Sequence, residues 1–556
     1  MKRMILCVMC LGPIVGCQKA DPDAKAFLDT YQKEFAELEK ASALASWAAS
    51  NSGKKEDFAK TAEARLALKK FHSNPESYKT IQALLAAKDQ LDPTDVRVLT
   101  VAELAFMGNQ LSPEMLKELV TLSTQIEETF NTFRGELDGE KLTNNVLLDM
   151  LAKETDSARR KAMWETLKQT GAAVASDLVK LAELRNKAAE ELGFANYWEM
   201  EIHLQAHDAK QLLAIFDELQ QVTEQPYKEM KAQLDGELAE RFGIPADGMM
   251  PWHYDNPFFQ AAPPSAAVDL DEFYKEKPKE EIVELAVTFF DDIGLPIDEI
   301  VARSDLYDRE GKDQHAFCTD IDRSGDVRTL CNIKPTVNWM DTMLHEQGHA
   351  IYSVSIDRSM PFNLRDSAHI LTTEGIAMMF GALAGNPTWL TGYAGADPAR
   401  VAEVEAGILE QRRREQLIFA RWAMVMLYFE KSMYEDPRQD LNTLWWDMVE
   451  RYQHVNRPES RDQPDWAAKP HFTIAPVYYH NYMLGELFAC QLRHVMAGMA
   501  DHEGSAATLS FNGRKEFGTF LKEKVFAPGT SVPWPEFVEN VTGEELTARH
   551  FAKEVE

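Results

Sequence analysis

Apolar residues recur at helical spacing along most of this chain of 556 residues. Within 156–192, for example, Val174, Leu178 and Leu181 share one helical face, and Gly193 follows as a residue that commonly ends helices. Similar patterns predict helices over 24–40, 56–71, 211–239, 279–293, 399–434 and 478–499. No long run of alternating polar and apolar residues competes with them, so the pattern predicts an all-α fold.

The best candidates for strands flank Cys318 and Cys331. Between them, Arg323-Ser324-Gly325-Asp326 is typical of a turn. We therefore expect one small β-hairpin inside an otherwise helical protein.

Two proline-rich stretches, 250–278 and 457–476, interrupt the helical pattern, because proline removes a helix hydrogen bond and clashes with the preceding turn. Both stretches contain aromatic residues, among them Trp252, Phe258 and Trp466. Disordered linkers are the alternative, but aromatic-rich loops favour packed segments that line a cleft.

Composition narrows the classes of protein and partner. Hydrophobic residues make up 45% of the chain, as in globular proteins, and the formal net charge is −30. So acidic a surface repels nucleic acid and anionic lipid, and we expect neither as a partner. We expect the protein to be a monomer.

The first residues have the pattern of an export signal. Lys2 and Arg3 precede an apolar stretch over 4–15 that is shorter than the about 20 residues of a membrane span. The stretch ends in Ile14-Val15-Gly16-Cys17, which resembles a bacterial lipobox. An ordinary secretory signal with an incidental cysteine is the alternative.

The lipobox interpretation divides the chain into a signal peptide (1–16), a tether (17–24) and one large domain (25–556). It implies that Cys17 carries lipid and that the protein is anchored in the bacterial cell envelope, facing the periplasm. The outer membrane is favoured over the inner one, because Gln18 after the cysteine is compatible with outer-membrane sorting. The only membrane contact expected is the lipid anchor.

Three cysteines remain beyond the lipobox: Cys318, Cys331 and Cys490. An oxidising compartment permits a disulfide, and Cys318 and Cys331 are the nearer pair in sequence. We expect this bridge, with three unpaired buried thiols as the alternative.

The run His345-Glu346-Gln347-Gly348-His349 has the spacing of a zinc site. On a helix, residues four apart lie on one face, so both imidazoles can bind one ion. Glu346 points to the neighbouring flank, where it can reach a water at the metal without displacing it. Gly348 leaves room for another element to pack closely.

A catalytic zinc needs a third protein ligand and an open position. Glu374 is the only carboxylate in the apolar run 372–380, and burying an unpartnered charge is costly. A metal ion is a sufficient partner, and the alternative is an acidic residue that merely stabilises a helix N-terminus. The pattern predicts His345, His349 and Glu374 as ligands of one zinc ion.

Further motifs follow the metal run in a recognisable order. They are Leu444-Trp445-Trp446 with Tyr452, Lys469-Pro470-His471, and Tyr479-His480-Asn481-Tyr482. Together with the metal motif and the Cys318 and Cys331 pair, they resemble the angiotensin-converting enzyme (peptidyl-dipeptidase A) family. The resemblance runs from about residue 22 to 550 and is strongest over 315–495.

The resemblance implies a role for each matching residue. It makes Glu346 the general base and later the proton donor, and Tyr482 the residue that stabilises the oxyanion. His471 would hydrogen-bond the substrate backbone, while Lys469 and Tyr479 would bind the C-terminal carboxylate of a short peptide. The implied fold is a large two-lobed helical peptidase with a deep central cleft and an N-terminal helical lid.

Several positions depart from the family pattern. Asn481 and Val449 stand where the family has arginines, one of which binds chloride, so we do not expect chloride as a cofactor. Around Cys318 the family has a histidine that contacts the substrate backbone, whereas Thr319 and Asp320 follow the cysteine here. Met378 replaces an aspartate that supports a zinc ligand, and such a loss weakens metal affinity.

The sequence favours a peptidyl-dipeptidase that releases C-terminal dipeptides from short peptides. A thimet-type oligopeptidase, which shares a similar metal motif and cuts internally, is one alternative. A lipid-anchored binding protein with a non-catalytic zinc site is another, although a structural site normally has four protein ligands and needs no base.

Overall fold

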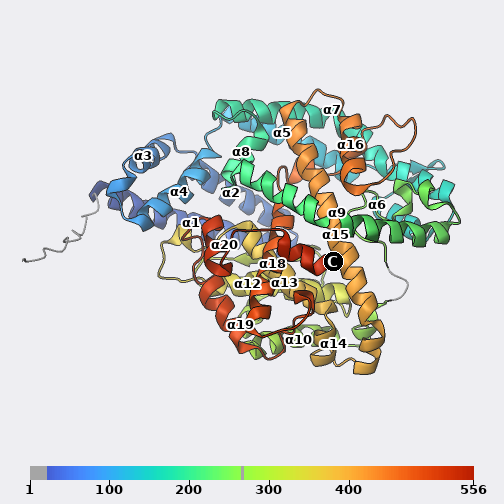
Figure 1. The fold of residues 1–556 in the computed structure, drawn as a ribbon. Helices are drawn as coiled ribbons and strands as arrows, with labels where there is room; N and C mark the ends of the chain where they lie inside the picture. Colours follow the sequence, from blue (N-terminus) through green and yellow to red (C-terminus); the bar gives the residue numbers. More distant parts are fainter. Residues whose placement is uncertain (1–21, 265–267) are drawn as a thin grey trace, which may run out of the picture.

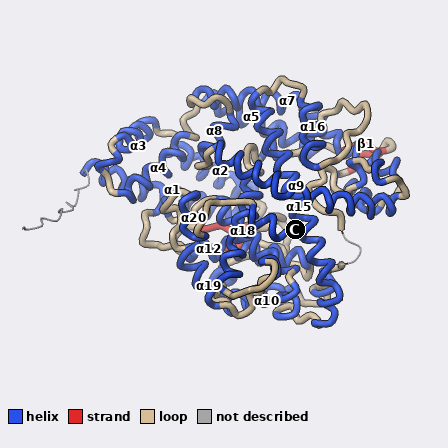
Figure 2. Tube along the Cα trace, viewed as in Figure 1, coloured by secondary structure: helices blue, strands red, loops and turns tan. Residues whose placement is uncertain are grey.

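The computed structural model describes residues 22–264 and 268–556, and helices dominate it (Figures 1 and 2). The predicted all-α class is confirmed. In the described part of the chain the strands form two small antiparallel hairpins, β1-β2 and β3-β4. The second hairpin is the predicted one, whereas the first was not expected. The predicted signal peptide and Cys17 lie outside the described residues.

The N-terminal helices form a group of their own at one side of the molecule (Figure 1). This group consists of α1 (Pro22–Ser52), α2 (Lys55–His72), α3 (Pro75–Ala86) and α4 (Pro93–Met107). Its apolar core is separate from the main one, and Phe362, Leu364 and the partly buried Met360 join it from the rest of the described chain. Gln32 also exchanges two hydrogen bonds with Asn363. This group corresponds to the predicted N-terminal lid.

A second group of helices lies in the upper part of Figure 1. Its long members are α5 (Pro113–Thr132), α7 (Ser157–Glu191) and α9 (Ala209–Phe242). The shorter members are β1 (Gly135–Leu137), β2 (Glu140–Leu142), α6 (Asn144–Lys153), α8 (Tyr197–Leu204), α16 (Leu441–Gln453) and α17 (His471–Ile474). Asp156 starts α7 by accepting the backbone N–H of Arg159, and Gly243 ends α9 in a left-handed conformation (φ +63°).

A third group lies below it and contains the metal motif. It begins with α10 (Lys279–Asp292), α11 (Asp298–Arg303), β3 (Phe317–Asp320), β4 (Val327–Leu330), α12 (Val337–Ser355), α13 (Ile370–Gly381) and α14 (Pro387–Gly392). It continues with α18 (His480–Met499), α19 (Lys515–Phe520), α20 (Trp534–Thr542) and α21 (Arg549–Val555). None of the described helices combines the length and the apolar character that crossing a membrane requires.

The long helix α15 (Pro398–Glu435) runs from the third group into the second (Figure 1). Its second half is buried on nearly all sides, from Leu417 to Tyr434, which explains the long apolar run in the sequence. A single apolar core extends through both groups. The two groups are therefore joined by continuous packing, and α15 contributes side chains to both.

The predicted disulfide between Cys318 and Cys331 is not formed, and both cysteines are free in the structure. The register of the hairpin explains this result. Cys318 pairs with Thr329 and Phe317 pairs with Leu330, so Cys331 lies past the last pair, diagonal to Cys318. Diagonal neighbours are about 7–8 Å apart, beyond the Cα separation of about 4.4–6.8 Å that a disulfide spans.

Candidate metal centre and peptide site

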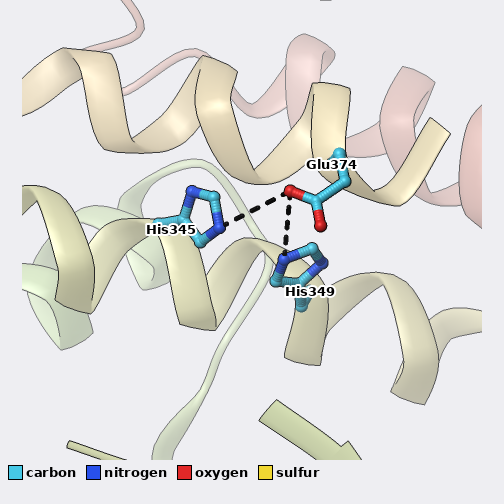
Figure 3. A group of neighbouring side chains, drawn as sticks. All are labelled: His345, His349 and Glu374. Carbon is cyan, nitrogen blue, oxygen red and sulfur yellow. Dashed lines mark ion pairs between the residues drawn. The ribbon is translucent and has the colours of Figure 1, made fainter. Parts of the chain in front are cut away.

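The two predicted histidine ligands lie one turn apart on α12, and the predicted carboxylate faces them from α13 (Figure 3). Oε2 of Glu374 is 3.9 Å from Nε2 of His345 and 4.0 Å from Nε2 of His349. Ligand atoms of all three side chains lie within 4.8 Å of one another. The structure thus brings together the three residues that the sequence predicts as ligands.

Glycines allow the helices of the site to approach closely. A Cβ atom on Gly348 of α12 would lie 2.9 Å from Cα of Ala377 on α13, too close for any side chain. On the other side of α13, a Cβ on Gly375 would lie 2.7 Å from the carbonyl oxygen of Gly485 on α18. The sequence predicts the close approach at Gly348. The three helices therefore pack backbone to backbone, which fixes Glu374 over the histidines.

The electrostatics of these three side chains suit a cation. Burial lowers the pKa of His345 to about 4, and burial together with His345 lowers that of His349 to about 3, so both imidazoles are neutral. Burial raises the pKa of Glu374 to about 7, because the surroundings disfavour a bare carboxylate. Thr373 lies 2.7 Å from Nδ1 of His349 and so orients Nε2 toward the site.

This donor set fits zinc. Two neutral imidazoles and one carboxylate are a common catalytic zinc set, which leaves a fourth position open. A divalent cation there would also favour the charged form of Glu374. The imidazole of His345 has no hydrogen-bond partner among the described residues, and the nearby Met378 offers no carboxylate. His345 is therefore held less firmly than His349, which Thr373 contacts. This agrees with the weaker metal binding expected from Met378.

Glu346 is buried beside the ligands on α12, with 7% of its surface exposed. Burial, and then the proximity of Glu374, raise its pKa to about 8, while a hydrogen bond from the backbone of Cys318 lowers it. A cation at the ligands would favour the carboxylate form. Thr319, the residue after Cys318, pairs with Arg328 in the hairpin.

The first turn of α18 joins the metal centre to a second cluster of polar side chains. Burial and then Glu374 raise the pKa of Tyr482, so its hydroxyl remains a donor at neutral pH. Tyr478 packs edge-on against Tyr482, with ring centroids 5.2 Å apart, and burial and then Glu374 raise the pKa of Tyr478 as well. Tyr479 also packs against Tyr482, with ring centroids 5.5 Å apart.

Lys469 and Tyr479, to which the resemblance gives a shared role, are both buried and in contact. The Lys469 ammonium donates to Oε1 of Gln260 at 2.5 Å and to the Tyr479 hydroxyl at 3.4 Å. It also lies over the rings of Phe258 and Trp422. No carboxylate pairs with it in the described part of the chain, and burial lowers its pKa to about 7. Sequence reasoning missed Gln260, which belongs to the proline-rich stretch 250–278.

His471 packs against Tyr479, with ring centroids 5.0 Å apart. Burial, and then Lys469, lower its pKa to about 4, and its Nδ1 is buried with no hydrogen-bond partner among the described residues. Arg185 fixes the turn that carries it by donating to the carbonyls of Phe472 and Thr473. His471 is therefore neutral, held in place and left with a free hydrogen-bonding atom.

The segment before α18 is strained and firmly held. Val477 has φ +51°, a conformation that β-branched residues rarely adopt. The buried Glu430 accepts its backbone N–H at 2.9 Å, and Gln205 donates to its carbonyl at 2.8 Å. Strain that neighbours enforce in this way is typical of functional sites. The backbone conformation of Val477 sets the direction in which Tyr478 and Tyr479 enter the cluster, and no sequence motif predicts this conformation.

Asn481 lies outside the peptide site. It is fully buried, its amide donates to Gln205 at 2.8 Å, and its oxygen is 2.9 Å from Nε2 of His207. Val449 packs in the apolar core on α16. Neither position carries the positive charge that an anion site needs.

Comparison with known proteins agrees with the geometry. The sequence model of the angiotensin-converting enzyme family matches residues 18–551. An angiotensin-converting enzyme of Theromyzon tessulatum is 22% identical over 432 residues, which are 72% of this chain and 68% of that protein. One from Mesocricetus auratus is 23% identical over 69% of this chain, but the match spans only 31% of that protein. Carboxypeptidase 1 of Bacillus subtilis is 26% identical over half of this chain and 57% of its own length.

Proposed function

The chain belongs to the angiotensin-converting enzyme family of zinc metallopeptidases, and from this premise we propose that it removes dipeptides from the C-terminus of short peptides. One observation supports this function above others. Tyr479 belongs to the pocket of Lys469 and Tyr482 to the metal centre, yet their rings are 5.5 Å apart. Two extended residues span about 7 Å, and the two adjoining tyrosines bring Lys469 and the metal ligands close together. We infer that a carboxylate held at Lys469 leaves the second peptide bond at the metal.

The pocket of Lys469 suits a peptide's C-terminal carboxylate. Lys469 supplies a positive charge, and the Gln260 amide and the Tyr479 hydroxyl supply neutral hydrogen bonds around it. Charge-assisted hydrogen bonds of this kind are the strong ones, and here they form away from bulk water. The other ring nitrogen of His471, Nε2, is not buried and has no hydrogen-bond partner among the described residues, which supports a hydrogen bond to the substrate backbone.

The proposed mechanism assigns a proton or a hydrogen bond to each remaining residue. Zinc, when bound, polarises the scissile carbonyl and acidifies water. Glu346 accepts the proton of the water that attacks the carbonyl carbon, and then donates it to the amine as the C–N bond breaks. Tyr482 donates a hydrogen bond to the carbonyl oxygen as negative charge develops there.

We also propose that activity does not depend on chloride. Asn481 is neutral, and both of its polar ends already face partners within the protein. Activity would then be constant between sulfate and chloride buffers of equal ionic strength.

The anchor at Cys17 remains a proposal from the sequence alone. A lipid on Cys17 would place the enzyme at the periplasmic face of a bacterial envelope membrane, the outer one being favoured. Substitution Cys17→Ser should release the protein from the membrane fraction, and fractionation of the two membranes would identify the one that holds it. Retention of Cys17→Ser in the membrane would contradict the anchor.

Hydrolysis of an N-benzoylated Gly-Ala-Leu peptide tests the proposed function. We expect one zinc ion per chain and release of Ala-Leu, which stops on chelation and returns with added zinc. A protein that binds zinc but releases nothing would instead be a binding protein. Free leucine as the first product would indicate a simple carboxypeptidase.

A further inference from the structure

A cavity of about 620 Å³ opens beside the metal centre, on the side of the third helix group. His345 lines it, so it is continuous with the site where peptide cleavage is proposed. Acidic side chains from three helices line it as well: Asp341, Glu415 and Glu486. None of these acids belongs to a motif that the sequence singles out.

Each of these carboxylates lies one helical turn from a residue of the peptide site. Asp341 precedes His345 by one turn on α12, and Glu486 follows Tyr482 by one turn on α18. Glu415 precedes Phe419 by one turn on α15, and the Phe419 ring packs 6.3 Å from that of Tyr479. The cavity is therefore placed to receive a side chain of the peptide segment between the metal and Lys469.

Two of the three carboxylates have no cationic partner. Glu486 accepts hydrogen bonds from Arg493 at 3.1 Å and from Gln416 at 3.0 Å, so its charge is compensated. In the described part of the chain, Asp341 and Glu415 form no ion pair with lysine, arginine or histidine. Glu415 accepts one hydrogen bond, from the Gln411 amide at 2.8 Å.

Arg412, the one lysine or arginine among the described residues that line the cavity, attracts both carboxylates but forms its ion pair with another acid. Arg412 lies 4.0 Å from Glu554, on the side where Arg493 also binds that carboxylate. Burial, and then repulsion by Glu415, raise the pKa of Asp341 to about 6, and burial raises the pKa of Glu415, while Arg412 lowers both. The carbonyl oxygen of Gln411, which also lines the cavity, is buried without a donor. Five carboxylates of the described residues line the cavity, those of Asp269, Asp271, Asp341, Glu415 and Glu486, against the single cation Arg412, so the cavity carries a net negative charge.

A second metal ion does not explain this arrangement. Over the ranges that the structure describes, the group His345, His349 and Glu374 is the one set of three such side chains close enough to share an ion. Asp341 and Glu415 have no third ligand of that kind. A cationic side chain with several N–H donors satisfies them better than an ion does.

We propose that this cavity binds the side chain of a C-terminal lysine or arginine, and that the enzyme prefers peptides ending in these residues. The inference rests on the proposed release of dipeptides. Phe419 and Tyr479 place Glu415 beside the carboxylate pocket, so the residue whose carboxylate Lys469 binds is the one whose side chain reaches Glu415 and Asp341. The preference follows from charge: the pocket of Lys469 takes the anion of that residue, and the cavity takes its cation.

The test compares N-benzoylated Gly-Ala-Lys, Gly-Ala-Leu and Gly-Lys-Ala. We expect kcat/KM for Gly-Ala-Lys to exceed that for Gly-Ala-Leu at least about 10-fold, which corresponds to about 1.4 kcal/mol. The double variant Asp341→Asn with Glu415→Gln should bring this ratio close to one. Glu405→Gln, which removes an exposed charge of the same helix outside the cavity, should leave the ratio as it is.

Several outcomes would overturn the inference. Release of Ala-Leu as readily as Ala-Lys would contradict it while the proposed function stood. A preference for Gly-Lys-Ala would place the wrong side chain in the cavity. If neither dipeptide is released, the proposed function fails, and calorimetry with free Ala-Lys and Ala-Leu decides the inference separately. Tighter binding of Ala-Lys that the double variant abolishes would support it, and equal binding would contradict it.

Discussion

The metal region (His345, His349 and Glu374) and the carboxylate pocket (Lys469, Gln260 and Tyr479) bury charge of opposite sign. In the metal region, a carboxylate lies beside two neutral imidazoles, and burial raises its pKa. In the carboxylate pocket, an ammonium lies among aromatic rings and neutral acceptors, and burial lowers its pKa. Within the described residues, neither group has a fully charged partner of opposite sign.

The difference indicates what each region binds. Burying an uncompensated charge is costly, and a folded protein keeps such a charge where a ligand supplies the partner. Among the described residues, no lysine or arginine pairs with Glu374 and no carboxylate pairs with Lys469. In the proposed function, a zinc ion and the C-terminus of a peptide would complete the two regions, and the first turn of α18 would set the spacing between them.

The largest expected effect comes from the metal region. Glu346→Gln removes the proton acceptor but leaves all three metal ligands, so kcat should fall about 10³-fold while one zinc ion per chain is retained. Metal analysis and steady-state kinetics on the same preparation check this. If the variant retained wild-type activity, Glu346 would not be the base.

The carboxylate pocket should show a smaller effect that depends on the substrate. Lys469→Ala removes a charged hydrogen-bond donor of about 1.5–3 kcal/mol, so kcat/KM for free-acid peptides should fall about 10- to 150-fold. Zinc content should not change, because Lys469 contacts no metal ligand. An equal loss in zinc and in activity would show that the two regions are not separable.

The pH dependence should show a smaller effect. The pKa of Lys469 is lowered to about 7, so its charge is present below that pH and is lost above it. The KM for free-acid peptides should therefore rise with pH above about 7, by up to about 10-fold per pH unit. Lys469→Arg stays charged throughout, and its KM should lack this rise. Parallel profiles for the two proteins would assign the titration to another group.

The sequence predicts the metal region well because its chemistry is local. Two histidines one turn apart define a helix face, and Glu374 begins the next apolar helix. Several long helices are predicted almost to their ends for the same reason: 156–192 was expected and Ser157–Glu191 is observed. The first helix is an exception, because 24–40 was expected and Pro22–Ser52 is observed, and α5 was not expected. The caps that end such helices lie in the neighbouring sequence.

The parts that the sequence does not predict depend on distant contacts. Gln260 reaches Lys469 from a loop more than 200 residues earlier, and nothing local distinguishes it from other glutamines. Asp341 and Glu415 look like ordinary acids on helix surfaces, and only the placement of α12 and α15 in the fold shows that they line one cavity. The prediction of a disulfide between Cys318 and Cys331 was wrong, because strand register, and not nearness in sequence, decides which residues face each other.

The position of the cut on a longer peptide tests the central claim most directly. An N-acetylated heptapeptide and its C-terminal amide are incubated with the zinc-loaded enzyme, and the first products are identified by mass spectrometry. We predict one dipeptide and one pentapeptide from the free acid, and almost no cleavage of the amide. Equal cleavage of both peptides at an internal bond would contradict the claim and favour an oligopeptidase.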